Sequence, residues 1–247
     1  MSDTEKNLQA KVNISVPDEA IPVHREIVKR LKLLEGGNFN SCLDSGFISL
    51  LNGVYELFQI FQKTVLEKSS INCCCSVSCA MCCNHWVEDV NSFEAEIIAD
   101  YIRKNRPRDI EKIINTCMDD CKELERLDNL VQNQLSLIDQ KKERIDEIDL
   151  LLSVYYQMKR PCPLLDHNSR CSVYPVRPFT CRIYVNLSDP SGCSPEYIND
   201  GEVNTYLLDL EENANEILDR LHFRFMKYEG DTGLRSLLPK YLEGPRN

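Results

Sequence analysis

CCCSVSCAMCCNHW occupies residues 73–86 and holds six of the 13 cysteines in this chain of 247 residues. Four more lie in a second stretch, CPLLDHNSRCSVYPVRPFTCRIYVNLSDPSGC, which spans residues 162–193. Thiolates bind soft or borderline cations, and ligands that are close in sequence lose less entropy when they gather on one ion. We therefore expect the two stretches to fold together around a metal centre, with the other cysteines outside it.

The spacing of the cysteines favours one kind of centre over another. The candidate ligands are Cys75, Cys79, Cys82, Cys83, Cys162, Cys171, Cys181 and Cys193, with Cys73 or Cys74 as substitutes in the first stretch. Adjacent cysteine side chains such as Cys82 and Cys83 generally diverge, so both need not contact the same metal. A few close cysteines plus distant ones are common in iron–sulfur clusters, whereas structural zinc usually shows two closely spaced pairs. The pattern favours an iron–sulfur cluster of the 4Fe–4S type, with zinc or iron alone as the alternative.

Composition excludes several classes of protein. The formal charge of -10 argues against nucleic-acid binding, which needs a basic face. The polar first residues contain no apolar core of signal-peptide length, and no later stretch approaches 18 uncharged apolar residues, so we expect no membrane segment. A cytoplasmic location follows, and thiol buffers there keep cysteines reduced and available to metals.

Apolar periodicity predicts helices over most of the chain. Residues 18–34 and 44–66 each carry one apolar helical face, and Asn91 with Glu94 resembles a capping box for a helix that Pro107 ends. Residues 203–225 also read as a helix, with Leu207, Leu208 and Leu210 available for packing. A short strand over residues 12–16 is suggested by alternating apolar residues.

The segment between Pro107 and Pro161 contains neither glycine nor proline and follows a heptad pattern. The heptad core positions are Ile110, Ile114, Cys117, Cys121, Leu124, Val131, Leu135, Ile138, Ile145, Leu152 and Tyr156. One unbroken helix would be roughly 75 Å long at about 1.5 Å per residue. We expect a helical hairpin that turns near Asp128–Gln132 or Asp139–Lys142, and keep as the alternative an arm that binds a protein partner or a second copy of the chain.

These elements predict a mostly α-helical fold with an irregular cysteine-rich metal-binding region and a helical hairpin or coiled-coil insertion. The predicted division is an N-terminal helical segment (1–70), a metal-binding domain (71–106 and 159–247) and the insertion (107–158).

The second cysteine stretch is similar to a known family. It resembles the YkgJ family of cysteine-cluster proteins, described as zinc- or iron-chelating, some of which look related to flagellin lysine N-methylases. The residues that carry the resemblance are Cys162, Pro163, Leu164, Asp166, Cys171, Tyr174, Arg177, Pro178, Cys181 and Arg182. The resemblance implies a metal or cluster and a mostly helical fold. Two alternatives stay open. One is a methylase-like enzyme that modifies proteins, and the other is an adaptor whose helical arm binds a partner while the metal only stabilises the fold.

Charged and imidazole side chains near the cysteines have alternative roles. A thiolate-ligated centre is negative, so Arg177 and Arg182 are candidates to bond sulfur or to pair with Asp166, with surface salt bridges as the alternative. His85 and His167 are weaker candidates for ligands. Cys117 and Cys121 lie one helical turn apart, and their heptad positions favour packing as small hydrophobes.

Overall fold

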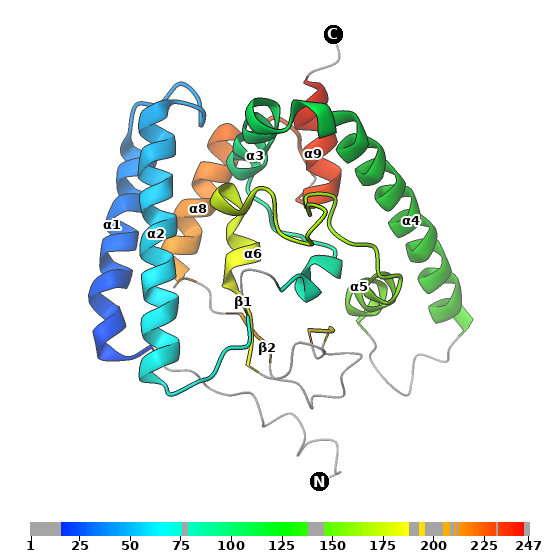
Figure 1. Cartoon of the computed structure of the whole chain (residues 1–247), viewed down its shortest axis with the longest axis horizontal. Helices are drawn as coiled ribbons and strands as arrows, with labels where there is room; N and C mark the ends of the chain where they lie inside the picture. The colour runs from blue at the N-terminus through cyan, green and yellow to red at the C-terminus, as the bar shows by residue number, and fades with distance from the viewer. Residues whose placement is uncertain are drawn as a thin grey trace.

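Helices make up most of the described chain, which confirms the predicted fold class. The computed structural model describes residues 16–75, 79–137, 146–187, 193–195, 205–207, 210, 212–230 and 232–244. The α-helices are α1 (Ile21–Gly36), α2 (Ser45–Lys68), α3 (Ser92–Asn105), α4 (Ile110–Leu137), α5 (Glu147–Gln157), α6 (Phe179–Ile183), α8 (Glu212–Phe225) and α9 (Leu234–Glu243). Short 3-10 helices occur at η3 (Asp18–Ala20), η4 (Met81–Asn84), η5 (Pro107–Asp109) and η6 (Tyr174–Val176). Figure 1 shows their arrangement.

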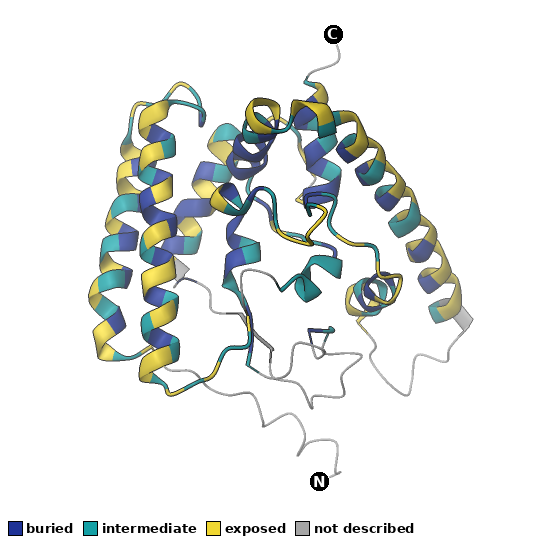
Figure 2. Ribbon diagram, viewed as in Figure 1, coloured by how far each residue is buried: buried dark blue, intermediate teal, exposed yellow. Residues whose placement is uncertain are grey.

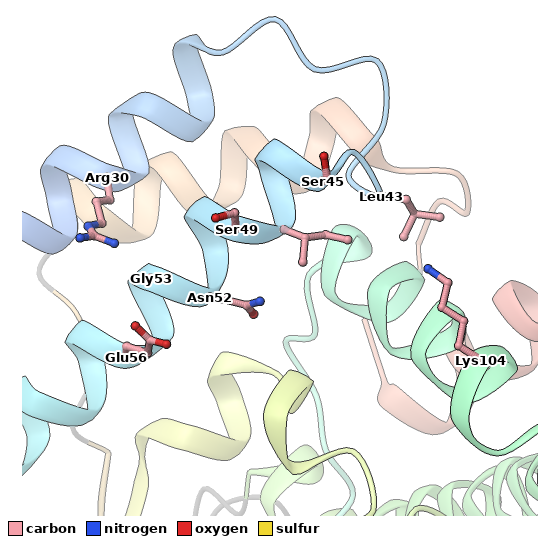
Figure 3. A pocket seen from close by; sticks show the side chains of 9 residues that line it. Arg30, Leu43, Ser45, Ser49, Asn52, Gly53, Glu56 and Lys104 are labelled. Carbon is pink, nitrogen blue, oxygen red and sulfur yellow. The ribbon is translucent and has the colours of Figure 1, made fainter.

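Helices α1 and α2 form an antiparallel pair along one side of the molecule (Figure 1). Their apolar stripes are buried against each other and against the rest of the core, as the periodicity predicts. Gly53 lies in the middle of α2, where a Cβ atom would come within 2.0 Å of Arg30 Nη1. The glycine therefore leaves room for the Arg30 side chain beside α2, at the rim of a surface pocket of about 610 Å³ (Figure 3).

Helix α3 begins at the predicted capping box. The Asn91 N–H donates to Glu94 Oε2 at 3.3 Å, and the helix ends at Asn105, just before Pro107. Its first turn also receives a contact from α8, because the Ser92 N–H donates to His222 Nδ1 at 3.0 Å. Helix α3 thus packs between α8 and α9, near the top of the view in Figure 1.

Helix α4 continues without a break through Leu137, so the predicted turn near Asp128–Gln132 is wrong. The alternative turn at Asp139–Lys142, with Ile138 and Ile145, lies outside the described residues. The buried face of α4 consists of Ile113, Cys117, Asp120, Leu127 and Val131, and it packs against α9 and α5. These positions keep the alternating spacing of three and four, but in a register shifted from the predicted one, because Ile110, Ile114, Cys121 and Leu124 are only partly buried. The described part of the chain shows no coiled coil.

The helix predicted over residues 203–225 begins only at Glu212. Residues Thr205–Leu207 form strand β2 instead, which pairs antiparallel with β1 (Tyr184–Asn186). Strand pairing satisfies backbone groups here, and helix propensity alone did not predict it. The strand suggested at residues 12–16 falls on Val12 and Ile14, which lie outside the described residues.

The buried residues face the inside of the helical layers, and both cysteine segments run between the α1–α2 pair and the α4–α5 side (Figures 1 and 2). The main core includes side chains from α1, α2, α3, α8 and α9. No helix in the described residues combines the length and apolarity needed to cross a membrane. The division into three segments stays a prediction.

Candidate metal centre

The first cysteine segment contains a single helical turn that is anchored by an aromatic side chain. Cys82 and Cys83 lie on η4, and the His85 N–H donates to Cys82 O at 3.1 Å. Trp86 follows directly, is buried, and packs edge-on against Tyr155 of α5 with ring centroids 5.3 Å apart. Burial of the indole therefore fixes the cysteine turn against α5.

The second cysteine segment begins with a tight loop that is hydrogen-bonded to the first. The Cys162 N–H donates to Cys83 O at 2.8 Å. The Asp166 side chain accepts the N–H groups of Asn168 at 2.8 Å and Arg170 at 2.9 Å, which closes the loop. Cys171 then forms an antiparallel bridge with Leu165. The CPLLDHNSRC sequence is thus a turn that leads from Cys162 back to Cys171.

Helix α6, which carries Cys181, is positioned by a buried carboxylate. Glu94 of α3 is 1% exposed, and its Oε1 accepts both the Phe179 N–H and the Tyr55 hydroxyl at 2.8 Å. Burial raises the pKa of Glu94, although these donors and Asn91 oppose the shift. Glu94 therefore connects the first turn of α6 to both α2 and α3.

Five thiols from both segments gather in one region, and we call them the inner cysteines: Cys82, Cys83, Cys162, Cys171 and Cys181. Burial raises the pKa of Cys181, and the charges of Cys162, Cys82 and Cys171 raise it further. The pKa of Cys83 is raised first by its hydrogen bond with the Cys82 thiol and then by burial. Adjacent side chains were expected to diverge, but Cys82 and Cys83 turn toward each other.

Cys82 is the inner cysteine whose pKa is lowered. The hydrogen bond from Cys83 lowers the pKa of Cys82, and the nearby Arg177 guanidinium lowers it further, against the effect of burial. The thiolate is the form that binds metals. Cys82 is therefore the inner cysteine most readily deprotonated among those whose pKa is shifted.

A second group of thiols surrounds Asn186 on β1, and we call these the outer cysteines: Cys74, Cys75 and Cys193. Asn186 is fully buried; its backbone N–H donates to Cys75 Sγ at 3.3 Å and its Nδ2 donates to Cys193 Sγ at 3.0 Å. The Cys74 N–H in turn donates to Asn186 O at 3.2 Å. Burial raises the pKa of Cys193 to about 11, and charges on Cys82, Cys79 and Cys74 add to it. Cys193 is therefore an outer cysteine that also lies near Cys82 of the inner group.

The thiols form a neighbourhood and not a closed coordination shell. Among the residues that the structure describes, no three or more Cys, His, Asp or Glu side chains are arranged as the ligands of one ion. The chemistry of the donor set nevertheless fits a soft or borderline metal, because the surrounding ligand atoms are sulfurs and a guanidinium balances their charge. All eight predicted ligands lie in the described residues, and their role as ligands stays a prediction.

The two predicted arginines occupy different environments. Arg177 stacks on Tyr174 at 4.3 Å, and its buried Nε has no hydrogen-bond partner among the described residues. Arg182 stacks on Tyr55 at 4.0 Å and donates to the carbonyl oxygens of Arg177 at 2.8 Å and Pro175 at 3.0 Å. Arg182 thus shapes the backbone before Cys181, while Arg177 has a donor available for the centre. The Asp166 carboxylate, predicted as a partner of these arginines, accepts the backbone N–H groups of Asn168 and Arg170 in its own loop.

A buried ion pair that sequence reasoning missed links the two cysteine segments. Arg235 of α9 is fully buried, and its Nε donates to Asp120 Oδ2 at 2.9 Å. Its other nitrogens donate to His85 O at 3.0 Å and to Arg160 O at 3.2 Å. His85 follows the first cysteine turn and Arg160 precedes Cys162. We call Arg235 and Asp120 the clamp; the signal that could have revealed it is a charged residue on the buried face of α4.

Cysteines and histidines outside the predicted ligand set have varied surroundings. Cys42 and Cys117 are fully buried in the main core, and the Cys42 thiol donates to Glu96 Oε2 at 3.4 Å. Burial raises the pKa of Cys117, with Cys162 as the next cause, so this core residue also borders the inner cysteines. The His85 ring contacts Cys193 O at 2.8 Å, whereas His167 is exposed and contacts Asn168.

Comparison with known proteins identifies one family. A family model named CxxCxxCC, with the description "Putative zinc- or iron-chelating domain", matches residues 73–205, which is more than half of the chain. The match begins at the first cysteine of the CCCSVSC segment and includes the whole of the second stretch. No curated protein and no solved structure matches the chain.

Proposed function

Because the chain belongs to the CxxCxxCC family of zinc- or iron-chelating domains, we propose that it holds an iron–sulfur cluster, of the 4Fe–4S type, with zinc as the alternative. The proposed ligands are taken from Cys75, Cys79, Cys82, Cys83, Cys162, Cys171, Cys181 and Cys193. The observation that carries the proposal is the junction of the two segments, where the Cys162 N–H donates to Cys83 O at 2.8 Å. Cys181 borders the same junction, since its pKa responds to Cys162 and Cys82.

Two features favour a cluster over a single zinc ion. A structural zinc site is closed by four ligands, whereas five inner cysteines and Cys193 lie in one neighbourhood here. The buried Arg177 Nε also has no acceptor within the described part of the chain, and a cluster presents sulfide as well as thiolate sulfur to such a donor. Both features support a centre that is larger and more negative than one tetrahedral ion.

The chain's own residues supply shielding and charge balance. Trp86, at the end of the first cysteine segment, and Phe179, within the second, are both buried and would shield a bound centre. The hydrogen bond from Cys83 and the charge of the Arg177 guanidinium both lower the pKa of Cys82, which favours the thiolate form. When bound, a cluster supplies one-electron transfer or an open iron for group transfer. A reducing compartment such as the cytoplasm would keep the thiols available.

Anaerobic purification followed by absorption spectroscopy and analysis for iron, zinc and acid-labile sulfide tests this proposal. We expect a brown protein with stoichiometric iron and sulfide. A colourless protein with stoichiometric zinc would replace the cluster with zinc, and a protein with neither metal would refute the proposed function.

The variant Cys181→Ser tests whether α6 supplies a ligand. We expect lower metal content and lower stability, because the free energy of metal binding is also folding free energy. The matched control is Cys42→Ala, since Cys42 is a buried cysteine that bonds Glu96 in the main core. Unchanged metal content in Cys181→Ser would remove Cys181 from the proposed ligands.

A further inference from the structure

Two buried donors near the inner cysteines have no hydrogen-bond partner among the described residues. They are the hydroxyl of Tyr156 on α5 and the Nε of Arg177. Burying a donor without an acceptor costs free energy, so native proteins rarely leave such groups unsatisfied. Two of them beside one group of cysteines indicate that each donor is placed to meet an acceptor there.

Tyr156 is held with its ring beside the cysteine segments. The residue is 2% exposed, and its ring lies against the His85 ring with centroids 4.6 Å apart. His85 connects Tyr156 to both cysteine groups, because its N–H donates to Cys82 O and its ring contacts Cys193 O at 2.8 Å. Lys159 Nζ lies 4.0 Å from the centre of the same ring. Burial raises the pKa of the Tyr156 hydroxyl, and the charges of Cys193 and Cys82 raise it further, which agrees with this placement.

Arg177 lies in the loop before α6, and its charge acts on Cys82 as well. Its guanidinium stacks on Tyr174, and its backbone carbonyl is occupied by the Arg182 side chain, so the residue is fixed at both ends. Among the inner cysteines its charge acts on Cys82, Cys171 and Cys181. The charge of Cys82 thus acts on the Tyr156 hydroxyl, and the charge of Arg177 acts on Cys82.

We propose that the Tyr156 hydroxyl and the Arg177 Nε donate hydrogen bonds to the sulfur atoms of the bound metal centre, at or next to Cys82, and so act as positioning residues that tune it. This inference rests on the proposed function. Donors from outside the ligand set orient the ligands and control metal affinity, and hydrogen bonds to sulfur help to set the reduction potential of a cluster. The Tyr155 hydroxyl also has no partner in the portion of the chain that the structure describes, but its ring lies with Trp86 and Arg235 in the clamp region.

The direction of the effect follows from charge. Hydrogen bonds to sulfur stabilise the reduced, more negative cluster more than the oxidised one, so removing a donor lowers the reduction potential. A tenfold change in the ratio of the two states corresponds to about 59 mV for one electron. We expect Tyr156→Phe and Arg177→Lys each to lower the potential by roughly that amount; the lysine keeps the charge but lacks the Nε donor.

The matched control is Tyr241→Phe. Tyr241 is also a buried tyrosine, but it lies on α9 beside Tyr228, away from the inner cysteines, and its hydroxyl faces the Lys227 backbone. We expect Tyr241→Phe to leave the potential at the wild-type value. In metal-free protein, Tyr156→Phe should keep or raise the melting temperature, because it removes a hydroxyl that has no partner.

The experiment measures the potential of the anaerobically loaded protein by spectroelectrochemistry. If the wild type carries zinc, competition with a chromophoric chelator replaces it, and we expect about 10- to 100-fold weaker zinc binding in both variants. Potentials or affinities equal to those of the wild type and Tyr241→Phe would overturn the inference while the metal centre stands. A lower melting temperature of metal-free Tyr156→Phe would also overturn it, since the hydroxyl would then have a structural partner. A wild type that binds no metal refutes the proposed function first and the inference with it.

Discussion

Replacing Arg235 with methionine would test the clamp, because this guanidinium holds together three segments of the fold. Its side chain is fully buried, as is that of Asp120, at 0% and 2% exposure. The substitution removes the Nε bond to Asp120 at 2.9 Å and the donors to His85 O and Arg160 O. Methionine matches the aliphatic part of the arginine side chain and carries neither a charge nor a hydrogen-bond donor.

The expected loss is about 3–5 kcal/mol of unfolding free energy, the usual cost of leaving one charge of a buried pair without its partner. Asp120 would retain one contact, with Arg160 Nε at 2.6 Å, and the Arg160 side chain is 34% exposed. Because that bond remains, the loss from the ion pair is about 3 kcal/mol. The lost hydrogen bonds to the two carbonyl oxygens add roughly 1 kcal/mol each to the loss of unfolding free energy. A domain is stable by only about 5–15 kcal/mol, so the effect is large.

Equilibrium unfolding in urea, followed by circular dichroism with a chelator and a thiol reductant present, measures this loss without a contribution from metal. The double variant Asp120→Leu with Arg235→Met should lose clearly less than the sum of the two single variants, because no unpaired aspartate remains. Arg235→Lys should fall between wild type and Arg235→Met, since lysine keeps the charge without the fork of donors. A loss below about 1 kcal/mol for Arg235→Met, or strictly additive losses, would refute the role assigned to the clamp.

Two further predictions concern helices that frame the centre. His222 accepts the Ser92 N–H at the start of α3 only while it is neutral, and burial lowers the pKa of His222. The contribution of this bond to stability is therefore fully present above the ordinary histidine pKa. It is lost as the pH falls through the lower pKa of the folded state. Acidification through this range should cost about 1 kcal/mol more in wild type than in His222→Gln, as measured by urea unfolding at several pH values, and parallel pH profiles would contradict this. Gly53→Ala should stabilise α2 by about 0.5–1 kcal/mol through helix propensity, because the atom that the new Cβ meets is the end of the flexible Arg30 side chain. Thermal unfolding measures this, and a lower melting temperature would indicate that Arg30 cannot move aside.

The sequence alone predicts the elements whose cause is local. The apolar period marks α1 and α2, and the Asn91–Glu94 capping box marks the start of α3. Pro107 marks its end, because proline cannot continue the hydrogen-bonded turn. The cysteine pattern also predicts a metal-binding family, since thiol spacing is itself the chemical signal.

Tertiary structure alone decides which of these local features meet. Asp120 reads as an ordinary charged residue of a helix until Arg235, from a distant helix, is found on the same buried face. The division of the thiols into inner cysteines and those around Asn186 depends likewise on where β1 lies. The physical reason is that helix period and capping act within a few residues, whereas a buried charge or thiol finds its partner only when whole faces pack together.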